Sequence, residues 1–341
     1  MRARRLRKGV RVVFERFKPI LRGEILGMSA LEKLGLNGSD LDSNHPSSER
    51  QNQTKDTYAF KWSKCDTYES DVVKSKHKAW LFEKYCDNDS DRLRKWLSGG
   101  RKIILDAGCG SAFSALLFFG NYLKDHDYLG VDISDAVNIA KKRFHEKGYR
   151  GDFLQIDLIN LPIPDESIDI IFSEGVLHHT DSTETSLKSL SKKLKKGGRF
   201  LFYVYTKKGV IREFTDDYIR EYLRNMSDED AWKALEPLTK LGIALGELNI
   251  EIDVPEDIQF FGIRKGKIDI QRFFYWNICK QFYHPEFSLN EMNHVNFDWF
   301  RPLNCHRHTP EEITQWCSEA GMGIEHINVQ EAGITVVAVK K

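Results

Sequence analysis

Short apolar runs that alternate with helical segments are the sequence feature that most constrains the fold of this chain. Residues 103–105 form one run, which ends in Asp106-Ala-Gly-Cys-Gly, and residues 128–131 form another, which ends in Asp132. Buried strands of parallel sheets have this pattern. The alternation predicts a doubly wound α/β sheet. Further strands are predicted at 153–156, 168–172 and 200–205, and helices at 112–123 and 135–147.

A helix start marks the return of the chain to the sheet near its C-terminus. Thr309-Pro-Glu-Glu supplies an N-cap Thr, a Pro at the first helical position and a Glu at the third. This is the pattern of a capping box. Residues 324–329 and 334–339 then predict two closing strands.

The segment 207–300 is predicted to be an insertion after the fifth strand. It holds 16 of the chain's 40 Phe, Trp and Tyr residues. Ser227-Asp-Glu-Asp opens one predicted helix, and residues 269–283 form another. A chain leaving that strand emerges at the carboxyl edge of the sheet, where ligands bind in open α/β folds. The aromatic residues therefore predict either a cap over a ligand site or simply an apolar core.

Five segments of the chain follow from these patterns. Residues 37–56 contain a single large aliphatic side chain, Leu41, among Gly, Ser, Asn and Asp, which predicts a flexible linker. The predicted segments are a basic amphipathic helix with the linker at 1–56, a helical lead-in at 57–100, the core at 101–206, the helical cap at 207–300, and a final helix with closing strands at 301–341.

The charge of the chain is balanced overall and concentrated locally. The 51 Lys and Arg residues against 50 Asp and Glu leave a net charge of +1, which gives no global field for binding nucleic acid. Residues 1–22, in contrast, contain nine basic residues and one acid, with apolar residues at helical spacing. This segment predicts a helix packed on its own domain, a contact with an anionic membrane surface, or a contact with nucleic acid phosphates.

Apolar stretches and the spacing of cysteines and histidines indicate the cellular compartment and whether a metal is bound. No stretch approaches the roughly 20 apolar residues that span a bilayer, and the six cysteines form no CxxC pair. We therefore expect a cytoplasmic protein with reduced thiols, with peripheral membrane association as the alternative. Cys305, His306 and His308 lie close in sequence, but no second cluster has zinc-ligand spacing, so no metal is expected.

A glycine-rich turn follows the first predicted strand. Gly108 and Gly110 in this turn allow the backbone to approach a ligand closely, and the N-terminus of the next helix faces the same point. A dinucleotide-binding turn requires a third glycine, where this chain has Phe113. The sequence therefore disfavours a nicotinamide cofactor.

The turn and the acid that ends the second strand together resemble the cofactor signature of class I S-adenosylmethionine-dependent methyltransferases. The resemblance rests on Asp106-Ala-Gly-Cys-Gly-Ser and on Asp132, 22 residues beyond Gly110. It implies a mostly parallel, seven-stranded α/β sheet that binds S-adenosyl-L-methionine. It implies a ribose contact for Asp132 and an adenine contact for Asp157. The implied cofactor residues are Asp106, Gly108, Cys109, Gly110, Asp132, Ile133, Asp157, Leu158 and Glu174.

Two adjacent histidines follow the fourth predicted strand, in Glu174-Gly-Val-Leu-His-His-Thr. This segment resembles the part of small-molecule methyltransferases that borders the transferred methyl group. Acceptors with a hydroxyl or a protonated amine must lose a proton, and a histidine suits that task. His178 or His179 is therefore predicted as a catalytic base or a positioning group, and the alternative is that they order the loop.

The acceptor is predicted to be a small molecule or glycan intermediate that is methylated on oxygen or nitrogen. Nucleic acid is disfavoured as the acceptor because Ser173-Glu-Gly-Val stands where nucleic acid methyltransferases often carry an Asn/Asp-Pro-Pro-aromatic motif. The alternatives are an RNA methyltransferase and a non-catalytic protein that binds S-adenosylmethionine. The predicted acceptor-binding residues are Tyr205, Asp298, Trp299, Arg301, His306 and His308.

Overall fold

The computed structural model describes residues 28–36, 47–64 and 67–341. The basic amphipathic helix predicted at 1–22 lies outside the described residues. Within these ranges, no helix is both long and apolar enough to cross a membrane.

A seven-stranded sheet forms the centre of the molecule, as the sequence predicted. Its strand order is β3-β2-β1-β4-β5-β9-β8. All neighbouring strands are parallel except β9, which runs antiparallel to both β5 and β8. The strands are β1 (Ile103–Ala107), β2 (Asp127–Asp132), β3 (Asp152–Gln155), β4 (Ile168–Glu174), β5 (Leu194–Tyr205), β8 (Met322–Val329) and β9 (Gly333–Lys340).

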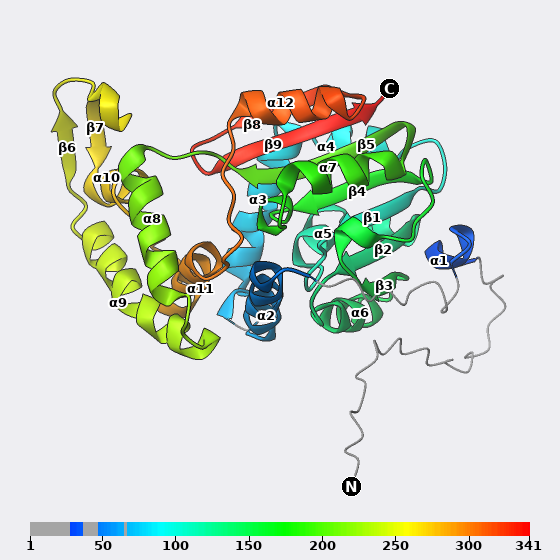
Figure 1. Cartoon of the computed structure of the whole chain (residues 1–341), viewed down its shortest axis with the longest axis horizontal. Coiled ribbons are helices and arrows are strands. Elements are labelled where there is room, and N and C mark those ends of the chain that lie inside the picture. The colour runs from blue at the N-terminus through cyan, green and yellow to red at the C-terminus, as the bar shows by residue number, and fades with distance from the viewer. Residues whose placement is uncertain (1–27, 37–46, 65–66) are drawn as a thin grey trace, which may run out of the picture.

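Helices cover both faces of this sheet, which explains why its strands are continuous apolar runs (Figure 1). One face carries α1 (Ala30–Lys33), α7 (Thr183–Lys193) and α12 (Pro310–Glu319). The other carries α3 (Asp71–Cys86), α4 (Ser90–Leu97), α5 (Phe113–Phe118) and α6 (Val137–Glu146). The helix predicted at 112–123 is shorter than expected, because α5 ends at Phe118 and a 3-10 helix, Gly120–Lys124, follows it.

The insertion forms a lobe to one side of the sheet, with α11 next to α2 (Figure 1). It contains α8 (Val210–Leu223), α9 (Asp228–Glu247), a hairpin of β6 (Glu251–Val254) and β7 (Gly266–Asp269), α10 (Ile270–Asn277) and α11 (Leu289–Phe300). Its apolar core includes Trp232 and Phe297 and reaches Tyr203 and Tyr205 at the end of β5. The aromatic residues of the insertion therefore include a true core that is continuous with the sheet edge.

The helix predicted over 269–283 ends early, at Asn277, and the chain then runs without regular secondary structure to α11. Gly242 and Gly246 on α9 explain the change. A Cβ atom at Gly242 would lie 2.9 Å from the Gln281 carbonyl oxygen, and one at Gly246 would overlap the Tyr283 ring. The two glycines thus let an extended segment pack directly on α9.

Helix α2 (Glu49–Ser63) corrects the predicted linker, which was expected to extend to residue 56. Ser48 caps this helix by accepting a hydrogen bond from the backbone N–H of Gln51. The buried side of the helix is polar and includes Thr54, Thr57 and Lys61. No apolar periodicity marks such a helix, so the hydrophobic pattern of the sequence does not reveal it.

Candidate functional site

A cavity of about 520 Å³ lies where the carboxyl ends of the strands meet α2 and the insertion. Ligand sites of open α/β folds occupy this edge of the sheet. The sheet contributes Gly108, Asp132, Ile133, Asp157, Leu158, Glu174, His179 and Tyr205 to its wall. The insertion contributes Tyr275, Lys280, Phe282, His284, Phe287, His294 and Asp298, and α2 contributes Gln51, Thr54, Tyr58 and Lys61.

The glycine turn has the backbone conformation that its residues predict. Gly108 lines the cavity with φ +86°, and a Cβ atom there would overlap the Val176 side chain. Gly110 has φ +49°, and a Cβ atom there would lie 2.5 Å from Nε1 of Trp62 on α2. Both glycines adopt left-handed conformations that side chains disfavour. Helix α2 therefore packs directly against the turn.

Asp132 lies at the end of β2 and faces the cavity. Its Oδ1 accepts hydrogen bonds from the backbone N–H and the hydroxyl of Ser134, at 2.8 and 2.6 Å. Its Oδ2 accepts one from the backbone N–H of Gly110 at 2.8 Å. A carboxylate has about four acceptor positions, so Asp132 keeps room for a further donor. Burial raises the pKa of this carboxyl, and the three hydrogen bonds oppose the shift.

Three predicted cofactor residues, Asp106, Cys109 and Gly110, do not line the cavity. Asp106 points away from it and accepts a hydrogen bond from the Tyr128 hydroxyl at 2.5 Å. Burial raises the pKa of Asp106 to about 7, against the effect of that hydrogen bond. Cys109 is also buried outside the cavity wall. Asp106 and Cys109 are therefore buried parts of the glycine turn and its strand that do not face the cavity.

Glu174 at the end of β4 lines the cavity, and it has a partner that the sequence does not reveal. Lys84 on α3 forms a buried ion pair with it, and the Tyr85 hydroxyl donates a hydrogen bond at 2.6 Å. The Lys84 ammonium lies 3.3 Å from the centre of the Trp80 ring and 3.9 Å from that of Tyr203. Burial lowers the pKa of Lys84 to about 8, and the Glu174 charge opposes the shift.

Replacing Lys84 with methionine is expected to lower the free energy of unfolding by about 3–5 kcal/mol, because Glu174 would then be buried without its counter-charge. Chemical denaturation of the purified variant measures the loss. The double variant Lys84→Met, Glu174→Gln is expected to recover most of the stability, since it removes both charges. Equal stability of wild type and Lys84→Met would show that the pair is not buried as described.

The two histidines after β4 have different surroundings. His179 lines the cavity, and its Nδ1 lies 2.6 Å from the Asn304 carbonyl oxygen, so Nδ1 carries the proton. Its Nε2 is buried without a partner among the described residues and therefore offers a free lone pair. His178 is buried beside Tyr205, outside the cavity wall. Of the two histidines, only His179 therefore lines the cavity.

Asp298 and Tyr205 are the two predicted acceptor-binding residues that face the cavity. Asp298 on α11 accepts a hydrogen bond from Lys61 at 2.5 Å and one from the Tyr205 hydroxyl at 3.0 Å. The Lys61 ammonium holds the pKa of this carboxyl below its usual range, although burial raises it. These contacts join α2, β5 and the insertion at one point of the cavity wall.

The other four predicted acceptor-binding residues lie outside the cavity wall, which corrects their placement. Trp299 donates a hydrogen bond to Asp216 at 2.9 Å, and Arg301 pairs with Asp228 at 2.7 Å. The His306 ring bonds to the Thr180 carbonyl oxygen and the His308 ring to the Thr183 hydroxyl. Trp299 and Arg301 thus join α11 to α8 and α9, and the rings of His306 and His308 hold the loop before α12 against residues 180–183.

Helix α2 and the segment after α10 supply a part of the cavity wall that the sequence patterns do not predict. The wall includes Tyr58, Lys61, Trp62, Lys280 and His294, none of which the sequence patterns mark as site residues. Burial lowers the pKa of His294 to about 3, so this ring is neutral at pH 7. In the part of the chain that the structure describes, no three His, Cys, Asp or Glu side chains are grouped to hold a metal ion.

Comparisons with known proteins match the core of the chain. Residues 105–202 match the family model described as a methyltransferase domain. The uncharacterized methyltransferase YcgJ of Bacillus subtilis is 34% identical over 100 residues, which are 29% of this chain and 38% of that protein. The probable tRNA methyltransferase 9B of Mus musculus is 30% identical over 132 residues, which are 36% of this chain and 26% of that protein.

A third relative is the ubiquinone/menaquinone biosynthesis C-methyltransferase UbiE of Azotobacter vinelandii. It is 31% identical over 116 residues, which are 33% of this chain and 46% of that protein. Each match thus spans less than half of the relative's own length. The matched region contains the glycine turn, Asp132 and Glu174, which the mostly parallel sheet brings to one cavity. Residues 105–202 of the chain are therefore similar to a methyltransferase domain, and they belong to the mostly parallel, seven-stranded sheet that the resemblance to class I S-adenosylmethionine-dependent methyltransferases implies.

Proposed function

We propose that the protein transfers a methyl group from S-adenosylmethionine to an oxygen or nitrogen atom of a small organic acceptor. The observation that carries the proposal is the single cavity shared by two sets of residues. Gly108, Asp132 and Glu174 line it from the sheet, and Lys280 and Asp298 line it from the insertion. Its volume of about 520 Å³ lies within the range of small-molecule sites.

The geometry suits a displacement in which the protein mainly holds and desolvates its reactants. Methyl transfer is accelerated when the attacking atom is held in line and near the methyl carbon. Aromatic side chains of the insertion, such as Phe282 and Phe287, provide an apolar wall for the acceptor. The free Nε2 of His179 provides a hydrogen-bond acceptor for the hydroxyl or amine that is methylated.

Replacing Asp132 with alanine is expected to weaken S-adenosylhomocysteine binding by about 1.5–3 kcal/mol, the value of hydrogen bonds to a charged group. Isothermal titration calorimetry measures the change. Asp135→Ala is the matched control, because Asp135 is an exposed acid three residues further along the same loop. Unchanged affinity in a folded Asp132→Ala variant would show that the ribose does not bind at the end of β2.

A transfer assay with labelled cofactor distinguishes the proposed acceptor class from the alternatives. The protein is incubated with methyl-labelled S-adenosylmethionine and either the small-molecule fraction of a cell extract or purified tRNA. The tRNA arm is included because one relative is named a probable tRNA methyltransferase. The proposal expects a labelled small molecule. Label in tRNA alone would assign a nucleic acid acceptor, and binding of the cofactor without any transfer would indicate a non-catalytic protein.

A further inference from the structure

Lys280 is a buried lysine that faces the acceptor side of the cavity. It is 7% exposed and belongs to the extended segment after α10. Lys280, Phe282 and His284 alternate along this segment and all line the cavity. The residues between them pack on α9, at Gly242 and Gly246. The extended backbone therefore fixes the direction of the Lys280 side chain.

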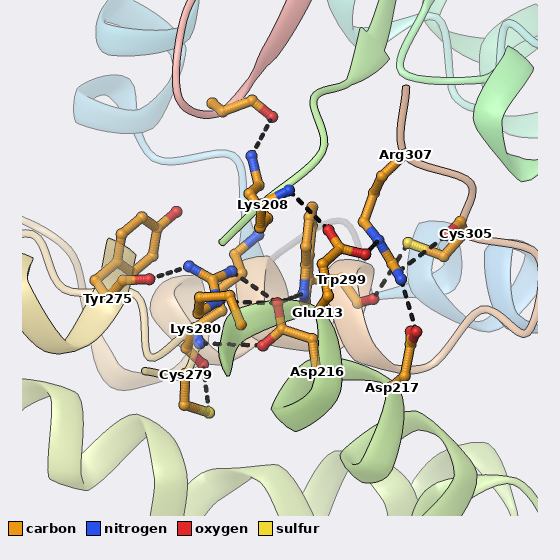
Figure 2. Close-up of polar contacts among 12 residues, drawn as sticks. Lys208, Glu213, Asp216, Asp217, Tyr275, Cys279, Lys280, Trp299, Cys305 and Arg307 are labelled. Atoms are coloured by element: carbon orange, nitrogen blue, oxygen red, sulfur yellow. Dashed lines mark hydrogen bonds and ion pairs between the residues drawn. The ribbon is translucent and has the colours of Figure 1, made fainter. Parts of the chain in front are cut away.

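The carboxylates nearest to Lys280 already bind other donors. Asp216 accepts hydrogen bonds from Arg212 and from the Trp299 indole on one oxygen, and from the backbone N–H of Lys280 on the other (Figure 2). Asp298 is bonded to Lys61 and Tyr205. Neither acid accepts a hydrogen bond from the Lys280 ammonium, although both carboxylates attract its charge from a distance.

Two further basic side chains, Lys208 and Arg212, lie in the same region but outside the cavity wall, and Arg212 is paired with Asp216. Lys208 donates hydrogen bonds to the backbone carbonyls of Glu331 and Ala332, not to an acid (Figure 2). The Lys280 ammonium lies 4.6 Å from the centre of the Trp299 ring. Among the described residues, no carboxylate lies within 4.0 Å of this ammonium and no group accepts a hydrogen bond from it.

A buried charge without a partner is costly, so such groups in ligand sites are commonly neutralised by the ligand. Burial lowers the pKa of Lys280 to about 8, against the attraction of Asp298, so the side chain remains mostly charged at pH 7. The Lys280 side chain faces the cavity, where a ligand could contact it. The other wall residues near it are apolar, aromatic or already paired.

We propose that Lys280 binds a carboxylate of the methyl acceptor, which makes the acceptor an aromatic or otherwise apolar carboxylic acid. This inference rests on the proposed function. One lysine neutralises one negative charge, whereas a phosphate dianion would keep an uncompensated charge in the cavity. The carboxylate held by Lys280 is a recognition group, and a separate oxygen or nitrogen of the acceptor takes the methyl group.

The test uses the transfer assay together with three variants of the full-length protein. Lys280→Met removes the charge and keeps most of the side-chain volume, and Lys280→Arg keeps the charge. Lys240→Met is the matched control, because Lys240 lies on the outer surface of the insertion and is 61% exposed. Circular dichroism confirms folding, calorimetry with S-adenosylhomocysteine measures cofactor affinity, and mass spectrometry identifies the labelled product.

The expected product of the wild-type protein retains a carboxylate. Lys280→Met is expected to lower kcat/KM for that acceptor by about 10- to 100-fold, mainly through KM, with S-adenosylhomocysteine affinity within twofold of wild type. Lys280→Arg is expected to retain more activity than Lys280→Met, and Lys240→Met to match wild type.

Three results would overturn the inference, and they are distinguishable. A labelled product without a carboxylate would refute the acceptor class but not methyl transfer. Loss of S-adenosylhomocysteine affinity in Lys280→Met would assign Lys280 to the carboxylate of the cofactor itself. Absence of any labelled small molecule with the wild-type protein would refute the proposed function and this inference with it.

Discussion

Replacing Gly108 with valine is expected to abolish measurable binding of S-adenosylhomocysteine. Gly108 has φ +86°, a conformation that costs a residue with a side chain roughly 1–2 kcal/mol. Any Cβ atom there also overlaps Val176, which itself lines the cavity. Relief of that overlap must separate the glycine turn from the loop after β4. Because both lie in the cavity wall, the site loses its shape, and calorimetry measures the loss.

Gly148→Val separates this effect from backbone strain alone. Gly148 follows α6 with φ +67°, and nothing lies within 4 Å of a Cβ atom built there. The Gly148→Val variant therefore has the same kind of backbone strain without a steric overlap. It is expected to bind S-adenosylhomocysteine like the wild type. A folded Gly108→Val variant with near wild-type affinity would remove the glycine turn from the cofactor site.

Replacing His179 with alanine is expected to lower kcat by about 10²- to 10⁴-fold, the usual contribution of a positioned general base. Cofactor affinity should stay within about threefold, because the free Nε2 serves the acceptor in this account. Steady-state kinetics with the identified acceptor measures the effect. His308→Gln is the comparison variant, since His308 bonds to Thr183 outside the cavity, and it is expected to keep kcat within about fivefold.

The pH profile gives a second measurement on His179. Burial lowers the pKa of this ring to about 4, although the Asp298 charge opposes the shift. A base works only when unprotonated, so its contribution is complete above about pH 5 and is lost as the pH falls through 4. An inflection of kcat/KM near 6.5 that disappears in His179→Ala would show instead that the ring is solvated. A full-activity His179→Ala variant would exclude the residue as base.

Local patterns in the sequence were sufficient to predict the strands of the sheet and part of the candidate site. The apolar runs predicted every strand of the main sheet, and the capping box at Thr309 is present in the structure. Gly108 and Asp132 face the cavity because a turn and a strand end fix their positions within a few residues. Such positions depend on backbone geometry that neighbouring residues determine.

The sequence does not predict which of two adjacent side chains faces the cavity. Asp298 faces the cavity while Trp299 packs in the insertion, because consecutive residues on a helix point about 100° apart. His178 and His179 lie in one 3-10 turn, Leu177–His179, yet only the second lines the cavity. The rotation of these elements is fixed by tertiary contacts, which a single sequence does not display.

The part of the cavity wall that α2 and Lys280 form could not be predicted from the sequence for a different reason. Helix α2 buries polar residues such as Thr54 and Lys61, so it lacks the apolar stripe that predicts a helix. The Lys280 segment is extended because Gly242 and Gly246, more than 30 residues earlier, provide a surface for it. Both features arise from pairing between distant parts of the chain.

A crystal structure of the protein with S-adenosylhomocysteine tests most directly whether the cofactor and the insertion share one cavity. We expect the ribose at Asp132, the adenine beside Asp157 and Leu158, and the sulfur directed toward the part of the cavity between His179 and Lys280. In that arrangement the insertion and the cofactor enclose one common space for the acceptor. A sulfur atom directed away from the insertion, or a cofactor bound outside this cavity, would contradict it.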